Sequence, residues 1–212
     1  RGRRITIKGQ PELQCTTVEI PGDPSSAAFL AVAALLTPRS NLILRNVGLN
    51  PLRSGIFDTL REMGASIREL NRRTTQGEPV ADLQIATSNL VGIEVPPDRA
   101  PAMIDEYPVL AIAAASAEGV TTMEGIGELR LKESDRISSI KRGLTSLGIK
   151  VNETEEGMRI YGRPDHNWTD RKVIISTELD HRVAMSFLVY GIVGGGSVQI
   201  DDVSTIETSF PG

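Results

Sequence analysis

Three segments of this 212-residue chain are apolar on nearly every side of the helix that each would form. Their sequences are SSAAFLAVAALL (25–36), EYPVLAIAAASA (106–117) and VAMSFLVYGIV (183–193). Each is long enough for a helix but shorter than the roughly 20 residues that a helix needs to cross a bilayer. A helix that is apolar all round must be buried all round. We therefore expect three central helices with the rest of the chain wrapped around them.

The same order of elements recurs around each apolar segment. Asp23, Asp105 and Asp180 precede the three segments, at spacings of 82 and 75 residues. A β-rich run follows each one (LILRNV, TTMEGI, VQIDDV), and two of these runs lead into amphipathic helices at 54–63 and 134–147. The fold class predicted is α/β: an inside-out α/β barrel of three related βαβ-type units, with sheets outside and the third unit truncated before its amphipathic helix.

Short β-rich runs between these helices predict the strands. They lie at 5–8, 16–20, 42–47, 83–87, 121–124, 150–153, 159–161, 173–175 and 198–200. The chain begins without Met and stops directly after a strand–turn pattern, which we interpret as a piece of a longer protein. We expect 1–20 to be the end of a partner domain and a hinge, and 21–212 to form one domain.

Charge and cysteine content exclude several classes of function. The net charge of −4 argues against a nucleic-acid binder, which usually has a basic surplus. A single cysteine, Cys15, rules out an internal disulfide, and with only two distant histidines it leaves no convincing metal site. The sequence also lacks a membrane-spanning run and a signal peptide, so a cytoplasmic chain is expected.

The charged residues gather where the apolar helices begin. Aspartate is a favoured N-cap, and that is the ordinary interpretation of Asp23, Asp105 or Asp180 taken singly. Three helix N-termini that converge at one end of a bundle also concentrate positive dipole potential there. Such an end favours phosphates and carboxylates as ligands.

Two short motifs strengthen the expectation of an anion site. In LKESDRI, the residues Lys132, Glu133 and Arg136 would share one helix face, which on its own could be an exposed salt-bridged turn. In DHR, Arg182 opens an apolar helix at the end where the helix dipole disfavours a cation, so an anionic ligand would explain it. The two carboxylates of DEYP, at 105 and 106, include a candidate general base.

These motifs together resemble the EPSP synthase family. The matching stretches GDPSSAAF, DEYPVLAIAAA, LRLKESDRI, LDHRVAMSFLV and TSFPG occur in the family's order and span about 4–211, most like the class II, glyphosate-tolerant bacterial type. The resemblance implies transfer of an enolpyruvyl group from phosphoenolpyruvate to shikimate 3-phosphate, without cofactor. It also implies a missing N-terminal domain, a monomer at full length, and no activity for this half alone.

The resemblance also implies residue roles. Asp105 would contact the 5-hydroxyl of shikimate 3-phosphate and accept its proton, and Glu133 would transfer a proton at the methylene of phosphoenolpyruvate. Lys132 would contact shikimate 3-phosphate, and Arg136 and Arg182 would hold phosphoenolpyruvate. Asp23 and Asp180 would line the same cleft. Glyphosate-sensitive members have a lysine just before the terminal TFP or SFP. Thr208 occupies that position here, so any role that the lysine has in those members is in doubt for this chain.

Two other functions fit part of the pattern. A UDP-N-acetylglucosamine enolpyruvyl transferase shares the three-unit architecture but lacks this pair of KESDR and DHR motifs. A non-catalytic anion-binding module could use the same helix ends, but it has no need of Glu133 beside Arg136. Fold alone does not separate these functions.

Overall fold

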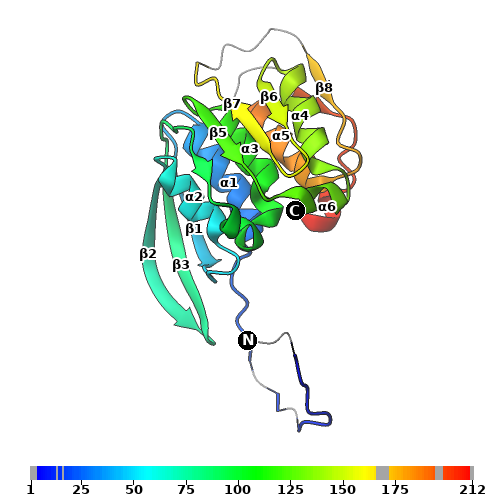
Figure 1. Cartoon of the computed structure of the whole chain (residues 1–212). Helices are drawn as coiled ribbons and strands as arrows, with labels where there is room; N and C mark the ends of the chain where they lie inside the picture. Colours follow the sequence, from blue (N-terminus) through cyan, green and yellow to red (C-terminus); the bar gives the residue numbers. More distant parts are fainter. Residues whose placement is uncertain (1–3, 13, 16, 166–171, 194–197, 211–212) are drawn as a thin grey trace.

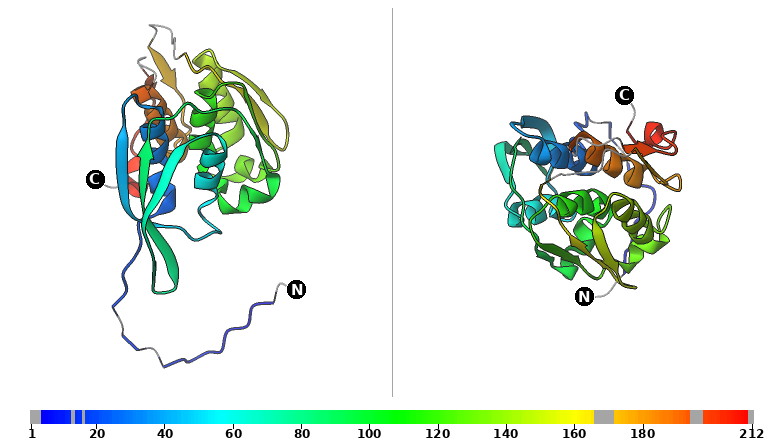
Figure 2. Two further views of the ribbon diagram at one scale, coloured as in Figure 1. Left: turned by 90° about the vertical axis from the view of Figure 1, so that its left-hand side faces the viewer. Right: turned by 90° about the horizontal axis from the view of Figure 1, so that it is seen from above.

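Three central helices organise the protein. The computed structural model describes residues 4–12, 14, 15, 17–165, 172–193 and 198–210. In it, α1 (Pro24–Leu36), α3 (Tyr107–Ala115) and α5 (His181–Val193) pack against one another, and the sheets lie outside them (Figures 1 and 2). This arrangement confirms the predicted α/β architecture with the Ala-rich helices inside.

The first unit surrounds α1 with an antiparallel sheet in the order β1-β3-β2. Its further elements are β1 (Asn41–Gly48), α2 (Gly55–Glu62), β2 (Ser66–Thr75) and β3 (Glu78–Ala86). Strand β2 was not predicted, because its residues are mostly polar and it pairs with a neighbour on one side only. A two-residue turn joins β2 to β3; Gln76 and Gly77 both have positive φ (52° and 88°), the pattern of a type I′ hairpin.

The second unit surrounds α3 with a four-stranded sheet in the order β4-β5-β7-β6. Its remaining elements, in chain order, are β4 (Glu94–Val95), η1 (Pro97–Ala102), η2 (Ile104–Glu106), β5 (Val120–Met123), η3 (Gly127–Leu131), α4 (Arg136–Ser146), β6 (Lys150–Glu153) and β7 (Met158–Tyr161). The two-residue strand β4 was too short to predict. Helix α4 packs on β6, on α3 and on α5.

The third unit contains β8 (Val173–Ile175), α5, β9 (Val198–Ile200) and α6 (Ile206–Ser209). The expectation that this unit stops before its second helix is corrected, since α6 forms one turn there. In all three units the segment before the central helix pairs in parallel with the strand after it: the Gly22–Val47 bridge, β4 with β5, and β8 with β9. This shared pairing confirms the repeated βαβ unit.

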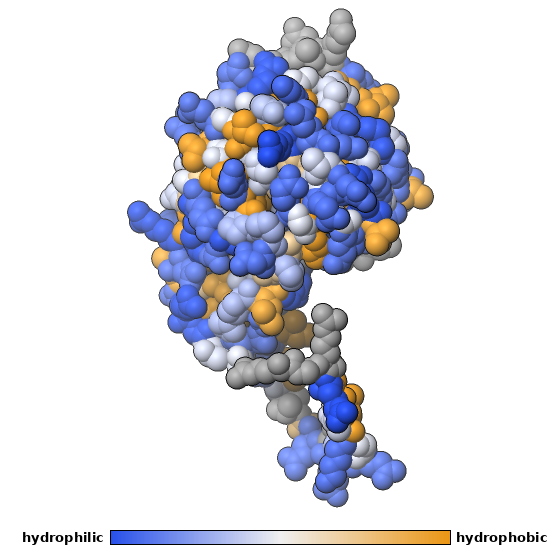
Figure 3. Space-filling model, in the orientation of Figure 1, coloured by the Kyte–Doolittle hydropathy of each residue, from blue (hydrophilic) through white to orange (hydrophobic). Residues whose placement is uncertain are grey.

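The described residues between 4 and 15 extend away from the body (Figures 1 and 3), whereas the Thr17 carbonyl accepts a hydrogen bond from Gln76 Nε2 at 2.8 Å and Gly22 pairs with Val47. The strands predicted at 5–8 and 16–20 are wrong for the described residues, which have no strand structure. Ile5 and Ile7 are 89% and 86% exposed, and a β-strand without a hydrogen-bonded neighbour is not stable. The segment leaves the body at the N-terminus of α1.

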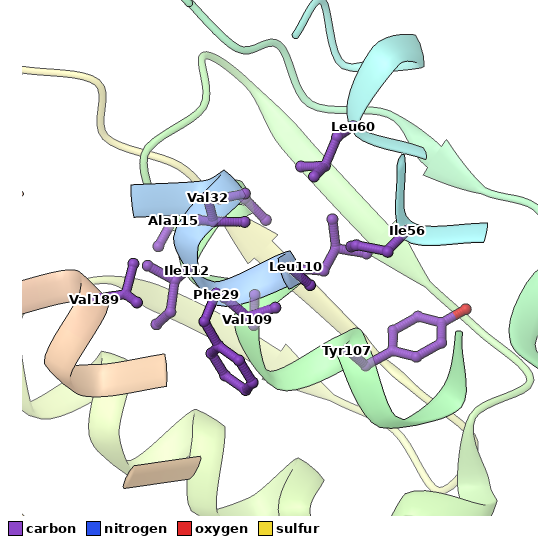
Figure 4. Close-up of a cluster of buried hydrophobic side chains, with 14 of the residues drawn as sticks. Phe29, Val32, Ile56, Leu60, Tyr107, Val109, Leu110, Ile112, Ala115 and Val189 are labelled. Carbon is purple, nitrogen blue, oxygen red and sulfur yellow. The ribbon is translucent and has the colours of Figure 1, made fainter. Parts of the chain in front are cut away.

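The hydrophobic core lies between the three central helices and the inner faces of the sheets (Figure 4). Every residue of α3 is buried, including Ala113, because α1, α5, α4 and β7 all contact this helix. Phe187 of α5 is fully buried as well, but Leu188 and Ile192 of the same helix are 39% and 68% exposed. Burial on every side therefore holds for α3 and not for α5, which the short strands β8 and β9 cover only in part.

Among the described residues, no helix combines the length and apolar character needed to cross a membrane.

Candidate functional site

The N-terminal ends of α1, α3, α4 and α5 meet at one end of the domain, and Arg136 lies at their junction. Its side chain is 1% exposed, and it donates hydrogen bonds to three carboxylates. Nε donates to Asp180 Oδ2 at 2.8 Å and Nη1 to Asp105 Oδ1 at 2.9 Å, while Nη2 donates to Glu133. Residues far apart in the sequence thus share one guanidinium.

Lys132 and Glu133 reach this cluster from a loop, which corrects the prediction that they share a helix face with Arg136. Helix α4 begins only at Arg136, and Asp135 caps it by accepting a hydrogen bond from the Ser138 amide at 3.1 Å. The Lys132 ammonium nitrogen lies 3.6 Å from the Asp105 carboxylate and 2.8 Å from Glu128. The loop between η3 and α4 therefore adds a cation beside Asp105.

Of the three aspartates that precede central helices, two act as caps and one does not. Asp23 accepts from the Ser26 amide at 2.9 Å, and Asp180 accepts from the amides of Arg182 and Val183 at 2.9 and 3.2 Å. Asp105 lies in η2, two residues before α3 begins at Tyr107, and no side chain caps α3 within the described part of the chain. The ordinary N-cap interpretation is correct for Asp23 and Asp180 and wrong for Asp105.

The Asp105 carboxylate is partly exposed, at 39%, and cations surround it. Burial alone would raise the pKa of Asp105, but the charges of Arg182, Lys132 and Arg136, and the hydrogen bond from Arg136, outweigh burial and lower it. This carboxyl group is therefore ionised at neutral pH. An exposed, ionised carboxylate among cations has the protonation state of a general base.

Arg182 differs from Arg136 in the donors that it leaves free. Its Nη1 approaches the Asp105 carbonyl oxygen at 3.2 Å and Glu106 Oε1 at 3.4 Å. Among the described residues its Nε and Nη2 have no hydrogen-bond partner, and the side chain is 18% exposed. Arg182 can therefore donate to an added anion directly, whereas Arg136 would first have to release a carboxylate such as Glu133, which is 49% exposed.

Glu106 belongs to this site although it was not among the predicted site residues. Its carboxyl group is nearly buried, and burial raises its pKa against the opposing effects of Ser25 and Arg182. Its signal in the sequence is the second carboxylate of DEYP, since that motif does not indicate which of its two carboxylates is the candidate general base. His181 precedes Arg182 in the chain. Burial, and then the positive charge of Arg182, lower the pKa of the His181 imidazole, so this side chain is neutral at pH 7.

Asp23 joins the site at its edge. Arg53 Nη2 lies 2.8 Å from the Asp23 carboxylate and 3.4 Å from the Ser25 hydroxyl, and Ser25 is in turn hydrogen-bonded to Glu106. A pocket of about 320 Å³ opens beside Asp23, lined also by Gly22, Asn50, Arg53 and Glu78 among others. All seven predicted site residues thus lie at one end of the domain.

No group of three or more His, Cys, Asp or Glu side chains suited to a metal ion occurs within the part of the chain that the structure describes. The three carboxylates that converge do so on a guanidinium. Pro211 and Gly212 of the TSFPG motif lie outside the described residues, as does the side chain of Thr208.

The site combines two kinds of group. Asp105 and Glu133 are solvent-accessible carboxylates that could exchange protons with a ligand, and both touch Arg136. Lys132, in the loop before α4, and Arg182, in the first turn of α5, are cations that could bind an anion, and the dipoles of the nearby helices add positive potential. The arrangement can bind phosphate or carboxylate groups and hold proton-transfer groups beside them.

Comparison with known proteins identifies the family. The family model described as EPSP synthase (3-phosphoshikimate 1-carboxyvinyltransferase) matches residues 1–212. The 3-phosphoshikimate 1-carboxyvinyltransferase of Paramagnetospirillum magneticum is 52% identical over 213 residues, covering 99% of this chain and 47% of that protein. The chain thus spans about half the length of the curated relatives it matches.

Solved structures agree with this result. An EPSP synthase from Acinetobacter baumannii has a TM-score of 0.86 and 42% identity, over 92% of this chain and 44% of that one. The enolpyruvyl transferase NikO from Streptomyces tendae, at 16% identity and a TM-score of 0.61 over 88% of this chain and 40% of that one, shares the fold alone. By the family model, the relatives and the structural match, this chain belongs to the EPSP synthase (3-phosphoshikimate 1-carboxyvinyltransferase) family.

Proposed function

We propose that the protein containing this chain transfers the enolpyruvyl group of phosphoenolpyruvate to the 5-hydroxyl of shikimate 3-phosphate. The products are 5-enolpyruvylshikimate 3-phosphate and inorganic phosphate. The observation that carries the proposal is the convergence of Asp105, Glu133, Lys132 and Arg182 around Arg136, in a chain of this family. Both substrates are anions, which the cations and helix ends of the site favour.

The reaction is an addition followed by an elimination. In the addition, the methylene carbon of phosphoenolpyruvate gains a proton, and the 5-hydroxyl oxygen bonds to the central carbon and loses its own proton. In the elimination, the tetrahedral intermediate loses phosphate and a proton from the methyl group, which restores the double bond. We assign the proton from the 5-hydroxyl to Asp105 and the proton at the methylene carbon to Glu133. The exposure of both carboxylates supports this assignment.

The other residues bind and position. Arg182, with free N–H donors, is assigned to phosphoenolpyruvate together with Arg136, and Lys132 to shikimate 3-phosphate. Asp180 is fully buried, so we assign it to holding Arg136 in place. Asp23, whose side chain is 44% exposed, is assigned to the edge of the substrate cleft.

A second domain is part of the proposal. The relatives are about twice as long, and the extended segment before α1 leaves the body at the end that carries the site. We therefore propose that 1–20 form the connection to a partner domain, that 21–212 form this domain, and that the substrates bind between the two. Enclosure strengthens electrostatic stabilisation, because solvent screens open charges. We expect the full-length protein to be a cytoplasmic monomer that needs no cofactor.

The decisive experiment measures phosphate release by the full-length protein. Release that requires both phosphoenolpyruvate and shikimate 3-phosphate is the expected result, and activity with UDP-N-acetylglucosamine instead would replace this proposal by the related transferase. Arg182→Ala should weaken phosphoenolpyruvate binding far more than it lowers the melting temperature. Equal losses would assign Arg182 to a structural ion pair.

A second experiment tests the need for both domains. The 212-residue chain alone should release no phosphate, and mixing it with the N-terminal half should restore turnover. Clear turnover by the chain alone would refute the two-domain cleft.

A further inference from the structure

Glu106 is a nearly buried acidic residue that contacts the starts of two other central helices. It lies at the end of η2, immediately before α3, and is 4% exposed. Its Oε1 lies 3.4 Å from Arg182 Nη1 in the first turn of α5. Its carboxyl group is also hydrogen-bonded to Ser25 in the first turn of α1. Glu106 thus links all three central helices at the end that carries the site.

The position of Arg182 depends on few protein contacts. Its Nη1 has two acceptors, the carbonyl of Asp105 and the carboxylate of Glu106, and both distances are at the long end of the hydrogen-bond range. Asp105 also presents an ionised carboxylate that is more exposed than Glu106. Without Glu106, the Arg182 guanidinium could form an ion pair with the Asp105 carboxylate. That ion pair would then have to break before Arg182 could bind an anionic ligand.

We propose that Glu106 is a positioning residue, which holds the Arg182 guanidinium where it can donate its free N–H groups to phosphoenolpyruvate. This inference rests on the proposed function and adds a residue outside the set that the motifs implied. Holding an arginine in place before the ligand arrives removes an ordering cost from binding. Glu106 acts through Arg182 and has no assigned contact with substrate.

The burial of Glu106 supports a functional rather than a stabilising role. The groups that face it are Arg182 from α5, Ser25 from α1, Asp105 beside it and Arg53 near the start of α2. Burial and the Asp105 charge raise the pKa of Glu106, and the other three groups lower it less. A carboxyl group with a raised folded-state pKa favours folding when protonated, and this contribution is lost as the pH rises through the folded pKa. Above that pKa the ionised side chain therefore costs stability, a cost that a functional site can retain.

The test uses the full-length protein with Glu106→Gln, which keeps the shape and an acceptor oxygen but cannot ionise. We expect KM for phosphoenolpyruvate to rise about tenfold, the effect of losing one charge-assisted hydrogen bond. KM for shikimate 3-phosphate should change less than about twofold, because Arg182 is not assigned to that substrate. The melting temperature should not fall. The matched control is Glu62→Gln, which removes the charge from another carboxylate–arginine pair, with Arg99, outside the site, and should leave both KM values unchanged.

A double-mutant cycle separates action through Arg182 from a direct role. In an Arg182→Ala background, Glu106→Gln should change the Kd for phosphoenolpyruvate less than about twofold, since the residue to be positioned is gone. An unchanged KM in the single variant, a further tenfold loss in the double variant, or an equal rise of both KM values with a lower melting temperature would each overturn the inference. An inactive wild type would instead overturn the proposed function, and this assignment with it.

Discussion

Asp180 and Asp23 each cap a helix and each form an ion pair with an arginine, but the first pair is buried and the second is exposed. The two aspartates therefore allow the effect of burial on an ion pair to be measured. Each caps a central helix and each pairs with an arginine at 2.8 Å. The pair of Asp180 with Arg136 is 0% and 1% exposed, whereas the pair of Asp23 with Arg53 is 44% and 57% exposed. The perturbation is Asp→Asn at each site, because asparagine caps helices as well as aspartate does.

The expected losses follow from burial. Breaking a buried ion pair leaves an uncompensated charge and costs about 3–5 kcal/mol. Arg136 keeps the partly exposed carboxylates of Asp105 and Glu133, so we place Asp180→Asn near the lower limit, about 3 kcal/mol. The pair at Asp23 lies in solvent, where such pairs contribute about 0.2–1 kcal/mol, so Asp23→Asn should cost less than about 1 kcal/mol.

Urea unfolding of the two variants and the unmodified chain, at neutral pH, measures both losses. The midpoints should differ while the dependence on denaturant stays constant, because the surface exposed on unfolding is unchanged. A loss for Asp180→Asn no larger than that for Asp23→Asn would refute the argument that burial sets the contribution of this cluster. A changed denaturant dependence would instead indicate altered structure.

Four further predictions concern three residues of the domain: Gly143, Tyr107 and Asp135. Gly143→Ala should destabilise the chain by about 1–2 kcal/mol in urea unfolding, because an added Cβ would lie 2.1 Å from the fully buried Phe187 ring and this clash exceeds the gain in helix propensity. Tyr107→Phe should leave stability unchanged or raise it by up to about 1 kcal/mol, because the buried hydroxyl has no hydrogen-bond partner among the described residues. Burial raises the pKa of Tyr107 to about 12, so absorbance titration should show this tyrosine un-ionised at pH 10 or so. Burial raises the pKa of Asp135, but the Ser138 amide and Arg130 outweigh it and the pKa is lowered. The stability difference between wild type and Asp135→Asn should therefore be present above about pH 4 and vanish as the pH falls through the lowered pKa; a difference that grows in acid would contradict it.

The sequence was sufficient for the elements whose pattern is local. The helices 24–36, 55–62, 107–115, 136–146 and 181–193 and the strands from 150 to 161 have periodic or β-rich patterns that predict them to within about two residues. Strand β2 was missed because an edge strand with polar faces has no apolar alternation. The runs 5–8 and 16–20 have strand-like composition, yet a strand forms only where a neighbour supplies hydrogen bonds.

Motifs in the sequence were also sufficient to predict the family and to select the residues that meet at one end of the domain. The roles of those residues remain proposals, since they depend on what the site binds. What the sequence did not determine is how deeply each charge is buried and which partner it has. Arg136 and Arg182 look alike as cations near helix starts, but one is enclosed by three carboxylates and the other keeps free donors.

Asp105 and Glu106 are adjacent carboxylates, yet the pKa of Asp105 is lowered and that of Glu106 is raised. The sequence did not determine this difference, because it did not determine how deeply each group is buried. The sequence by itself determined the three-unit repeat, the apolar central helices and the list of charged residues at their starts. Only the tertiary structure decided that Asp105 is partly exposed among cations while Glu106 is enclosed between α1 and α5. Desolvation and Coulomb interaction depend on distances between groups far apart in the chain, and those distances exist only once the three units have packed together.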